Sequence, residues 1–384
     1  MYGYIFSKSL KTFFLFLGIL LITLRTFYFY NIGLSPFPIL GVFFLFIYLL
    51  MSRGSFLIDK KIISWLSLFL VAIVFSMIDP LFNTKDFNIT SFFGLVLGML
   101  LFISFHCYKG LNELEIIKVV KCVLLVHVIF FFYQFISFHI FGNLVDLIEP
   151  ITGHAQRGIG FIDKEYGGMA AFRATGLFDE PASYCTYVLA LTFVAYYNSR
   201  KLDLLELTIL ISVILTLSLT GFALVVAYML TKKDIKNVFS IKNSMLILIG
   251  VVIVLSMFGD LLIGYATQRL NELGSDNSAN VRINNFSNIL ELTTIQLLLG
   301  SGIGNNPVFV VEYTFPSLII TFGIVGGGLI VLSFLMIFSN SINYRTLIFF
   351  SVLSLNFYTL FNPFTWLFAS ILNVLTYKHY LTRR

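Results

Sequence analysis

The chain has 384 residues, of which 58% are hydrophobic and only 11% are charged, and its mean hydropathy is +0.92. This balance excludes a soluble globular protein of the same length and is typical of an all-α polytopic membrane protein. The apolar stretches are continuous rather than alternating, which argues against a membrane β-barrel. Although the formal net charge is +6, we expect the partners to be membrane lipids and not nucleic acid.

Hydrophobic runs predict about twelve membrane segments. In chain order we expect them at residues 12–30, 36–51, 62–78, 89–107, 119–142, 181–198, 203–218, 221–231, 244–259, 314–338, 346–361 and 365–377. Lysine and arginine are retained on the cytoplasmic side of a membrane, so the connecting loops set the orientation. Eighteen of the 25 basic residues fall on one side of this layout, which places both termini in the cytoplasm.

Two stretches are predicted to be short hairpins rather than full double crossings. Basic residues flank the first stretch at Arg200–Lys201 and again at Lys232–Lys233, so the chain must enter and return between them. At about 1.5 Å per residue, the stretch 204–230 is too long for one crossing and too short for two, so it allows only a short or re-entrant hairpin. We place its polar tip at Ser218–Gly221, and the tip of the second hairpin at Asn362–Pro363.

Two long external loops, 143–180 and 260–313, are predicted within a single integral membrane domain that covers residues 1–384. The cytoplasmic side of this layout carries 13 lysines and 5 arginines, whereas the external side carries 2 lysines and 5 arginines. A lysine point charge suffices for orientation, but the planar guanidinium of arginine can pair with two phosphate or carboxylate oxygens at once. The external preference for arginine therefore indicates an anionic ligand.

The most informative motif is Arg-Ala-Thr-Gly-Leu-Phe-Asp-Glu-Pro, which starts at Arg173 where the first external loop leads into a membrane segment. Charged groups at a membrane boundary are costly to keep, which makes them functional candidates. We expect Arg173 to bind phosphate and Glu180, or in second place Asp179, to act as general base for a hydroxyl group. The structural alternative is that the acids only cap the helix that starts at Pro181, with Arg173 paired to one of them.

A second candidate segment lies in the loop 260–313 and contains Arg269 and Arg282. Residues 283–299 are predicted to form an amphipathic helix along the membrane interface. The run from Gly300 to Asn305, Gly-Ser-Gly-Ile-Gly-Asn, is not interpreted as a nucleotide-binding loop, because no strand precedes it. We expect it to bring Arg282 to the site, and its amides could bind an anion. The alternative is a solvated loop with positioning charges.

Histidines, cysteines and the remaining glycines add less to the candidate site. His154 is external and either acts as a base or substrate contact, or is an ordinary solvated residue. The three cysteines lack metal-ligand spacing, as do the histidines, so we expect no metal and no other cofactor. Four glycines in the predicted segment 314–338 are expected to allow close helix packing.

Taken in order, these segments resemble the O-antigen polymerase (Wzy) and O-antigen ligase superfamily of bacterial envelope enzymes. The resemblance covers roughly residues 173–328. It consists of an R-x-x-G-x-F-x-E-P block, a short hairpin with a Ser/Thr–Gly tip, a second arginine-bearing loop, a G-x-G-x-G-N-N run and a glycine-rich span. It implies a GT-C-like, all-helical membrane glycosyltransferase with a cavity that opens outward.

The resemblance further implies polymerisation of undecaprenyl-diphosphate-linked oligosaccharide repeat units at the outer face of the bacterial cytoplasmic membrane, for O-antigen, lipopolysaccharide or capsule synthesis. The transfer would be independent of metal, and a co-polymerase would regulate chain length. The resemblance also implies roles for individual residues. Arg173 and Arg282 would bind the diphosphate, and Glu180 or Asp179 would be the carboxylate base. Further substrate contacts would come from the loops, through Arg269, Arg157, His154 and Asn305.

Two alternatives remain open. A ligase-type transferase would use a different acceptor, and that branch commonly relies on a histidine in the second loop. No histidine occurs between Arg157 and Arg345, which favours the polymerase. A transporter or flippase of lipid-linked oligosaccharide would place charges within its spans and show internal repeats, whereas here the external charges gather in two loops.

Overall fold

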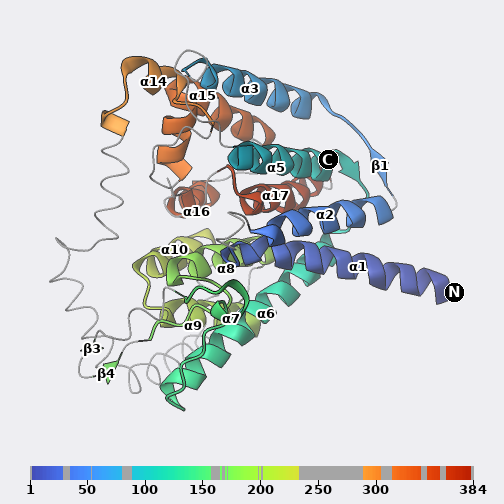
Figure 1. Cartoon of the computed structure of the whole chain (residues 1–384). Coiled ribbons are helices and arrows are strands. Elements are labelled where there is room, and N and C mark those ends of the chain that lie inside the picture. The colour runs from blue at the N-terminus through green and yellow to red at the C-terminus, as the bar shows by residue number, and fades with distance from the viewer. Residues whose placement is uncertain are drawn as a thin grey trace. The chain divides into compact units, whose positions relative to one another are not determined.

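The computed structural model describes residues 2–28, 35–52, 54–79, 89–156, 165–166, 169–170, 172–197, 199, 202–232, 289–303, 314–338, 344–354 and 360–381. Most of these residues are helical (Figure 1). The helices are α1 (Tyr2–Thr23), α2 (Pro36–Met51), α3 (Lys60–Ser76), α5 (Ile89–Cys107), α6 (Glu113–His139), α7 (Glu149–Thr152), α8 (Pro181–Ala195), α9 (Leu204–Leu215), α10 (Leu219–Thr231), α14 (Thr294–Leu299), α15 (Thr314–Phe338), α16 (Tyr344–Ser354) and α17 (Pro363–Leu381), together with the 3-10 turn η1 (Leu24–Thr26).

Two very short antiparallel pairings accompany the helices. Strand β1 (Ser55–Phe56) pairs with β2 (Tyr108–Lys109), and β3 (Glu165–Tyr166) pairs with β4 (Met169–Ala170). Each strand has two residues, so these pairings tie loops together and do not form a sheet core. The prediction of an all-α protein is confirmed at this level.

Helices overlap eleven of the twelve predicted membrane segments, and the segment 244–259 lies outside the described residues. Two of the described helices, Glu113–His139 and the Pro316–Phe338 part of α15, are long and apolar enough to span a membrane. The other apolar stretches of helix that were searched, including parts of the longer helices α1, α5 and α17, have 10 to 17 residues. Twelve crossings and a GT-C-like arrangement therefore stay predictions.

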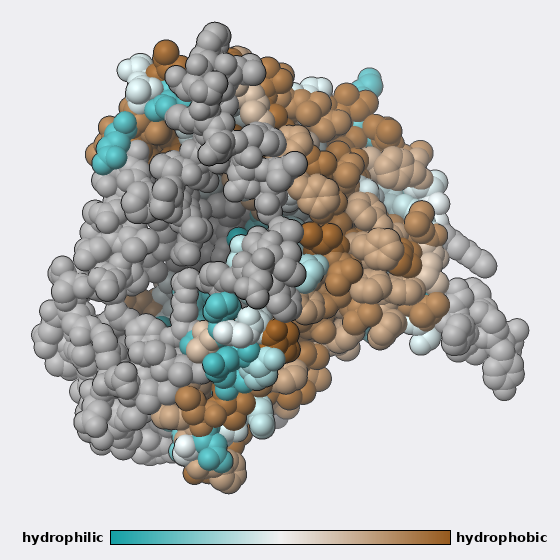
Figure 2. Space-filling model, in the orientation of Figure 1, coloured by the Kyte–Doolittle hydropathy of each residue, from teal (hydrophilic) through white to brown (hydrophobic). Residues whose placement is uncertain are grey.

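Exposed apolar side chains agree with a membrane environment. Phe43, Leu50 and Val74 are 58%, 86% and 64% exposed. Figure 2 shows hydrophobic residues covering the surface where Figure 1 places α2, α3 and α5, while hydrophilic residues form small patches near α7 and α14. Apolar surface of this extent is unfavourable in water and is expected where helices face lipid.

The chain divides into two compact units, and the prediction of one integral domain stays a prediction. Unit 1 comprises Met1–Thr23, Pro36–Val119 and Val281–Arg384. In unit 1, α1 packs on α2, α3 on α15 and α5 on α17. Its core is an aromatic cluster in which Trp65 lies 4.9 Å from Phe102 and 6.0 Å edge-on from Trp366, measured between ring centroids. Both tryptophans are fully buried.

Helix α15 is broken at Gly323, where φ is +67°. The break leaves carbonyl groups of the first half without helical partners, and the glycine run supplies donors for them. The backbone N–H of Ser301 donates to Ile320 O at 2.8 Å, and that of Gly302 donates to Thr321 O at 3.2 Å. A Cβ on Gly300 would collide with Thr321 O, so only glycine allows this crossing.

Polar contacts fix the end of unit 1 where α3 begins and α5 ends. Asp59 caps α3 by accepting a 2.9 Å hydrogen bond from the backbone N–H of Ile62. Its other carboxylate oxygen lies 3.1 Å from His106 Nε2, and the amide nitrogen of Asn373 lies 2.7 Å from His106 Nδ1. One buried imidazole thereby connects α3, α5 and α17.

Unit 2 comprises Leu24–Ser35 and Val120–Asn280. Helices α8, α9 and α10 pack on one another, and α8 is buried along almost its whole length. The α9–α10 hairpin is present as predicted, but its turn is Thr216–Ser218, because Ser218 caps α10 by accepting from the Gly221 N–H. Leu219, Thr220 and Gly221 therefore belong to the first turn of α10 and not to the tip.

Candidate functional site

The segment from Phe172 to Glu180 brings the first predicted motif to one end of unit 2. Arg173 is only 7% exposed, and its Nε donates a 3.1 Å hydrogen bond to the carbonyl oxygen of Thr216. Thr216 is the C-terminal capping residue of α9, where unpaired carbonyls carry partial negative charge. The arginine side chain is thus held at the tip of the hairpin by the negative end of a helix.

The hairpin tip has an unusual backbone that suits this contact. Leu217 has φ = +54°, a left-handed conformation that is uncommon for residues other than glycine. The turn reverses the chain within three residues, so the C-terminus of α9 and the N-terminus of α10 meet beside Arg173. Gly221 completes the packing, because a Cβ at that position would lie 2.7 Å from Cys185 Sγ on α8.

Two buried glutamines hold the motif from its other side. The Oε1 atom of Gln134, on α6, accepts hydrogen bonds of 2.9 Å from the backbone N–H groups of both Thr175 and Gly176. The Nε2 atom of Gln156 donates to Thr175 Oγ1, Gly176 O and Phe178 O at 3.1, 2.8 and 2.8 Å. Gln134 and Gln156 are 0% and 2% exposed, so water does not compete for these bonds.

The acids of the motif stand at the start of α8. Pro181 is the first residue of the helix and Glu180 its N-terminal capping residue, with extended backbone angles and no capping hydrogen bond from its side chain. Instead, Glu180 Oε1 accepts a 3.2 Å hydrogen bond from Ser183 Oγ. Side-chain capping therefore does not account for this carboxylate. Asp179 and Glu180 are both partly exposed, in contrast to the buried residues before them.

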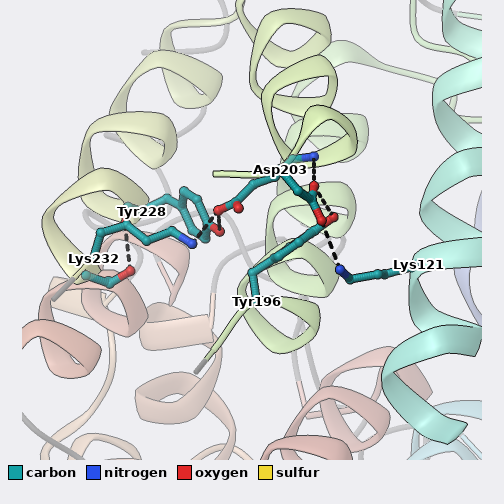
Figure 3. Close-up of polar contacts among 7 residues, drawn as sticks. Lys121, Tyr196, Asp203, Tyr228 and Lys232 are labelled. Carbon is teal, nitrogen blue, oxygen red and sulfur yellow. Dashed lines mark hydrogen bonds and ion pairs between the residues drawn. The ribbon is translucent and has the colours of Figure 1, made fainter. Parts of the chain in front are cut away.

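A second polar cluster lies at the opposite end of the same helices, where α8 and α10 end and α9 begins. Figure 3 shows its polar contacts. Buried Lys232 forms an ion pair with Glu206, which also accepts a hydrogen bond from Tyr228 Oη. Next to it, Asp203 accepts hydrogen bonds of 2.6 Å from Tyr196 Oη and 3.0 Å from Lys121 Nζ. Helix α8 has 15 residues, so the two clusters are separated by roughly 20 Å along the helices.

The structure describes half of the predicted site residues. It places Arg173, Asp179 and Glu180 in one segment of unit 2. His154 follows the left-handed residue Gly153 at the end of α7 and is exposed, so it differs from the buried Arg173. The other four predicted residues lie outside the described part of the chain: Arg157, Arg269, Arg282 and Asn305.

Two expectations for the second loop need correction. The amides of Ser301 and Gly302 donate to carbonyl groups of α15, so these two amides are not available to an anion. Gly304 and Asn305 of the same run lie outside the described residues. The predicted helix 283–299 is interrupted in its described part, because Thr293 starts a new helix through a capping box with Gln296. Residues 283–288 lie outside the described residues.

Sequence reasoning missed Gln134, Gln156 and Thr216, which position the motif. The one sequence signal that could have identified Gln134 is its position as a lone glutamine near the end of an apolar helix, because an amide in a membrane segment requires partners. Thr216 acts through its backbone carbonyl, which no sequence pattern reveals. Within the described residues, no group of three or more His, Cys, Asp or Glu side chains could hold a metal ion.

The arrangement combines a buried arginine, bonded to the hairpin tip, with carboxylates at a helix N-terminus. Such a site can stabilise a negative leaving group and accept a proton from a hydroxyl. Comparison of the chain with known protein families, with curated proteins and with solved structures finds no match.

Proposed function

We propose that this protein is a membrane glycosyltransferase that polymerises undecaprenyl-diphosphate-linked oligosaccharide repeat units at the outer face of the bacterial cytoplasmic membrane. The observation that carries the proposal is the placement of Arg173. A buried arginine, anchored to the hairpin tip through Thr216 O, stands seven residues before a carboxylate at the start of α8. The ordered motifs of the sequence, which resemble those of O-antigen polymerases, supply the reaction class.

The proposed step is a transfer at the anomeric carbon of the donor glycan. The hydroxyl oxygen of the acceptor sugar forms a bond to that carbon, and the bond from the carbon to the diphosphate oxygen breaks. Glu180 accepts the hydroxyl proton, and the electron pair of the broken bond leaves with undecaprenyl diphosphate. Arg173, with Arg282 from the second loop, stabilises the negative charge on this leaving group.

Two energetic contributions are asked of the protein. A preorganised donor at a developing anion contributes on the order of 10²–10³ in rate. A general base contributes about 10²–10⁴. Because the diphosphate is already a good leaving group, the reaction mainly needs these two contributions. The motif supplies a group for each, namely an arginine for the anion and a carboxylate for the proton.

Reconstitution tests the proposal. Purified protein in liposomes is given an undecaprenyl-diphosphate repeat unit, and the products are separated on a gel. We expect a ladder of polymers with wild-type protein and a loss on the order of 10²-fold or more with Glu180→Gln. Ser183→Ala is the matched control, because it removes the hydrogen bond to Glu180 but keeps the carboxylate.

Three outcomes would contradict the proposal. Unchanged substrate with folded wild-type protein would exclude the polymerase. Transfer of a single glycan to a different acceptor, without a ladder, would indicate a ligase-type transferase. Movement of the intact lipid-linked unit across the bilayer would indicate a transporter.

A further inference from the structure

The glutamine pair Gln134 and Gln156 uses its full hydrogen-bonding capacity on and around the motif. Gln134 accepts from two backbone N–H groups and donates through Nε2 to Val145 O at 2.8 Å and to Gln156 Oε1 at 2.6 Å. Gln156 Oε1 also accepts from the N–H of Leu147 at 3.2 Å. A side-chain amide has two N–H donors and one acceptor oxygen with two lone pairs, so every position of the Gln134 amide is occupied.

This occupation fixes the orientation of both amides. Turning the Gln134 amide over would point its N–H groups at the N–H groups of Thr175 and Gly176. Turning the Gln156 amide over would point its oxygen at two carbonyl oxygens, those of Gly176 and Phe178. The backbone of Gln156 is held as well, because its N–H donates to Asp146 Oδ2 at 2.7 Å. The two glutamines, called the glutamine clamp from here on, therefore have one arrangement of donors and acceptors.

The glutamine clamp is hydrogen-bonded to the chain between Arg173 and Glu180, the two reactive groups of the proposed site. Thr175 lies two residues after Arg173, and Phe178 lies two residues before Glu180. Successive Cα atoms are about 3.8 Å apart, so each group is at most two peptide units from a clamped backbone atom. A third backbone contact comes from α6 itself, since a Cβ on Gly176 would lie 3.2 Å from Phe131 N.

We infer that Gln134 and Gln156 are positioning residues for the proposed glycosyl transfer, which set the distance between the arginine that binds the diphosphate and the carboxylate that accepts the proton. This inference rests on the proposed function. Neither glutamine touches substrate in this role; each acts through the backbone of Thr175–Phe178. This positioning affects the rate of transfer, because a displacement of about 1 Å in a reacting group can lower the rate on the order of 10²-fold.

Gln156→Met and Gln134→Met test the inference, because methionine has a similar length and no amide. For each variant, kcat and KM for the lipid-linked donor are measured per amount of folded protein. We expect kcat to fall by on the order of 10²-fold, with KM changed much less. Thr192→Val is the matched control, because Thr192 is buried in α8 and its hydroxyl donates only within that helix, to Val188 O. It should retain wild-type kcat.

A double-mutant cycle separates positioning from a general loss of folded protein. Gln156→Met is combined with Arg173→Lys, which keeps the positive charge but removes the planar guanidinium. If the glutamine acts by placing the guanidinium, its substitution costs much less in the Arg173→Lys background than in wild type. Effects that simply multiply would overturn the inference and leave Gln156 with a structural role.

Hydrogen exchange provides a readout that does not depend on activity. Gln134→Met removes the acceptor of the Thr175 and Gly176 N–H groups, so exchange in peptides covering 172–180 should accelerate while α8 stays protected. Unchanged exchange in these peptides would contradict the glutamine clamp.

If wild-type protein forms no product at all, the proposed function fails and the positioning role falls with it. If wild type and both glutamine variants form product equally fast, only the positioning role is overturned.

Discussion

Arg173 and Thr216 lie 43 residues apart in the chain and are joined by a 3.1 Å hydrogen bond from Nε to the carbonyl oxygen. The bond links the end of the first predicted external loop to the tip of the α9–α10 hairpin. The residue after Thr216, Leu217, has φ = +54°, so the turn that carries this carbonyl includes a backbone conformation that is uncommon for residues other than glycine.

Replacing Arg173 should reduce glycosyl transfer strongly. We expect Arg173→Ala to lower the rate by on the order of 10²–10³, and Arg173→Lys to recover only part of it, because lysine lacks the planar fork. The rates are measured in liposomes per amount of folded protein. Wild-type polymer lengths and rates in Arg173→Ala would remove this residue from the site.

Breaking the buried ion pair of Glu206 and Lys232 should destabilise unit 2. Lys232→Met leaves a buried carboxylate without its cation, which costs about 3–5 kcal/mol. The double variant Lys232→Met, Glu206→Leu removes both charges and should recover much of the loss. Thermal unfolding in lipid nanodiscs measures this, and a double variant no more stable than the single one would contradict the interpretation.

The glycine at the break in α15 should not tolerate a side chain. A Cβ on Gly323 would collide with Leu298 O, and its positive φ adds strain, so we expect Gly323→Ala to cost about 1–3 kcal/mol. Gly328→Ala in the same helix is the matched control, because nothing lies within 4 Å of its added Cβ. Equal melting temperatures for the two variants would contradict this account.

Acidification should weaken the contacts that Asp59 makes in unit 1. Burial acts to raise the pKa of Asp59, but the N–H of Ile62 and the adjacent His106 outweigh it and lower the pKa below its ordinary value of 3.8. The stabilisation from the ionised carboxylate is therefore complete above 3.8 and is lost as the pH falls through the lower pKa of the folded state.

Asp59→Asn isolates this effect, because asparagine also caps a helix well but carries no charge. The melting temperature of wild type should exceed that of the variant near neutral pH, and the difference should shrink as the pH falls below 3.8. A difference that stays constant down to strongly acidic pH would show that the charge of Asp59 contributes nothing.

Much of the helix layout could be predicted because apolar runs report directly on helices that face lipid or a core. The hairpin between Arg200–Lys201 and Lys232–Lys233 followed from charge and length alone. Its turn was misplaced by about two residues, because Ser218 resembles a tip residue in sequence but serves as the cap of α10. Capping and turn chemistry draw on the same residue types, so sequence does not separate them.

The candidate site was predictable in part for a similar reason. Arg173 and Glu180 stand out as charges in an apolar chain, whereas Gln134 and Gln156 are neutral and 22 residues apart. Their pairing depends on how α6 meets the loop after it, which is a tertiary contact. The amides of Ser301 and Gly302 were misjudged because the break at Gly323 that recruits them is not visible from glycine content alone.

The crossing of Gly300 with the broken helix α15 limits how this protein can change in length. The backbone N–H groups of Ser301 and Gly302 donate hydrogen bonds to carbonyl groups in the middle of α15. The end of the second predicted external loop is therefore held in one position within unit 1. Insertions after Leu298 would pull those amides out of register with Ile320 and Thr321. Variation in the length of this predicted loop is therefore expected before Leu298.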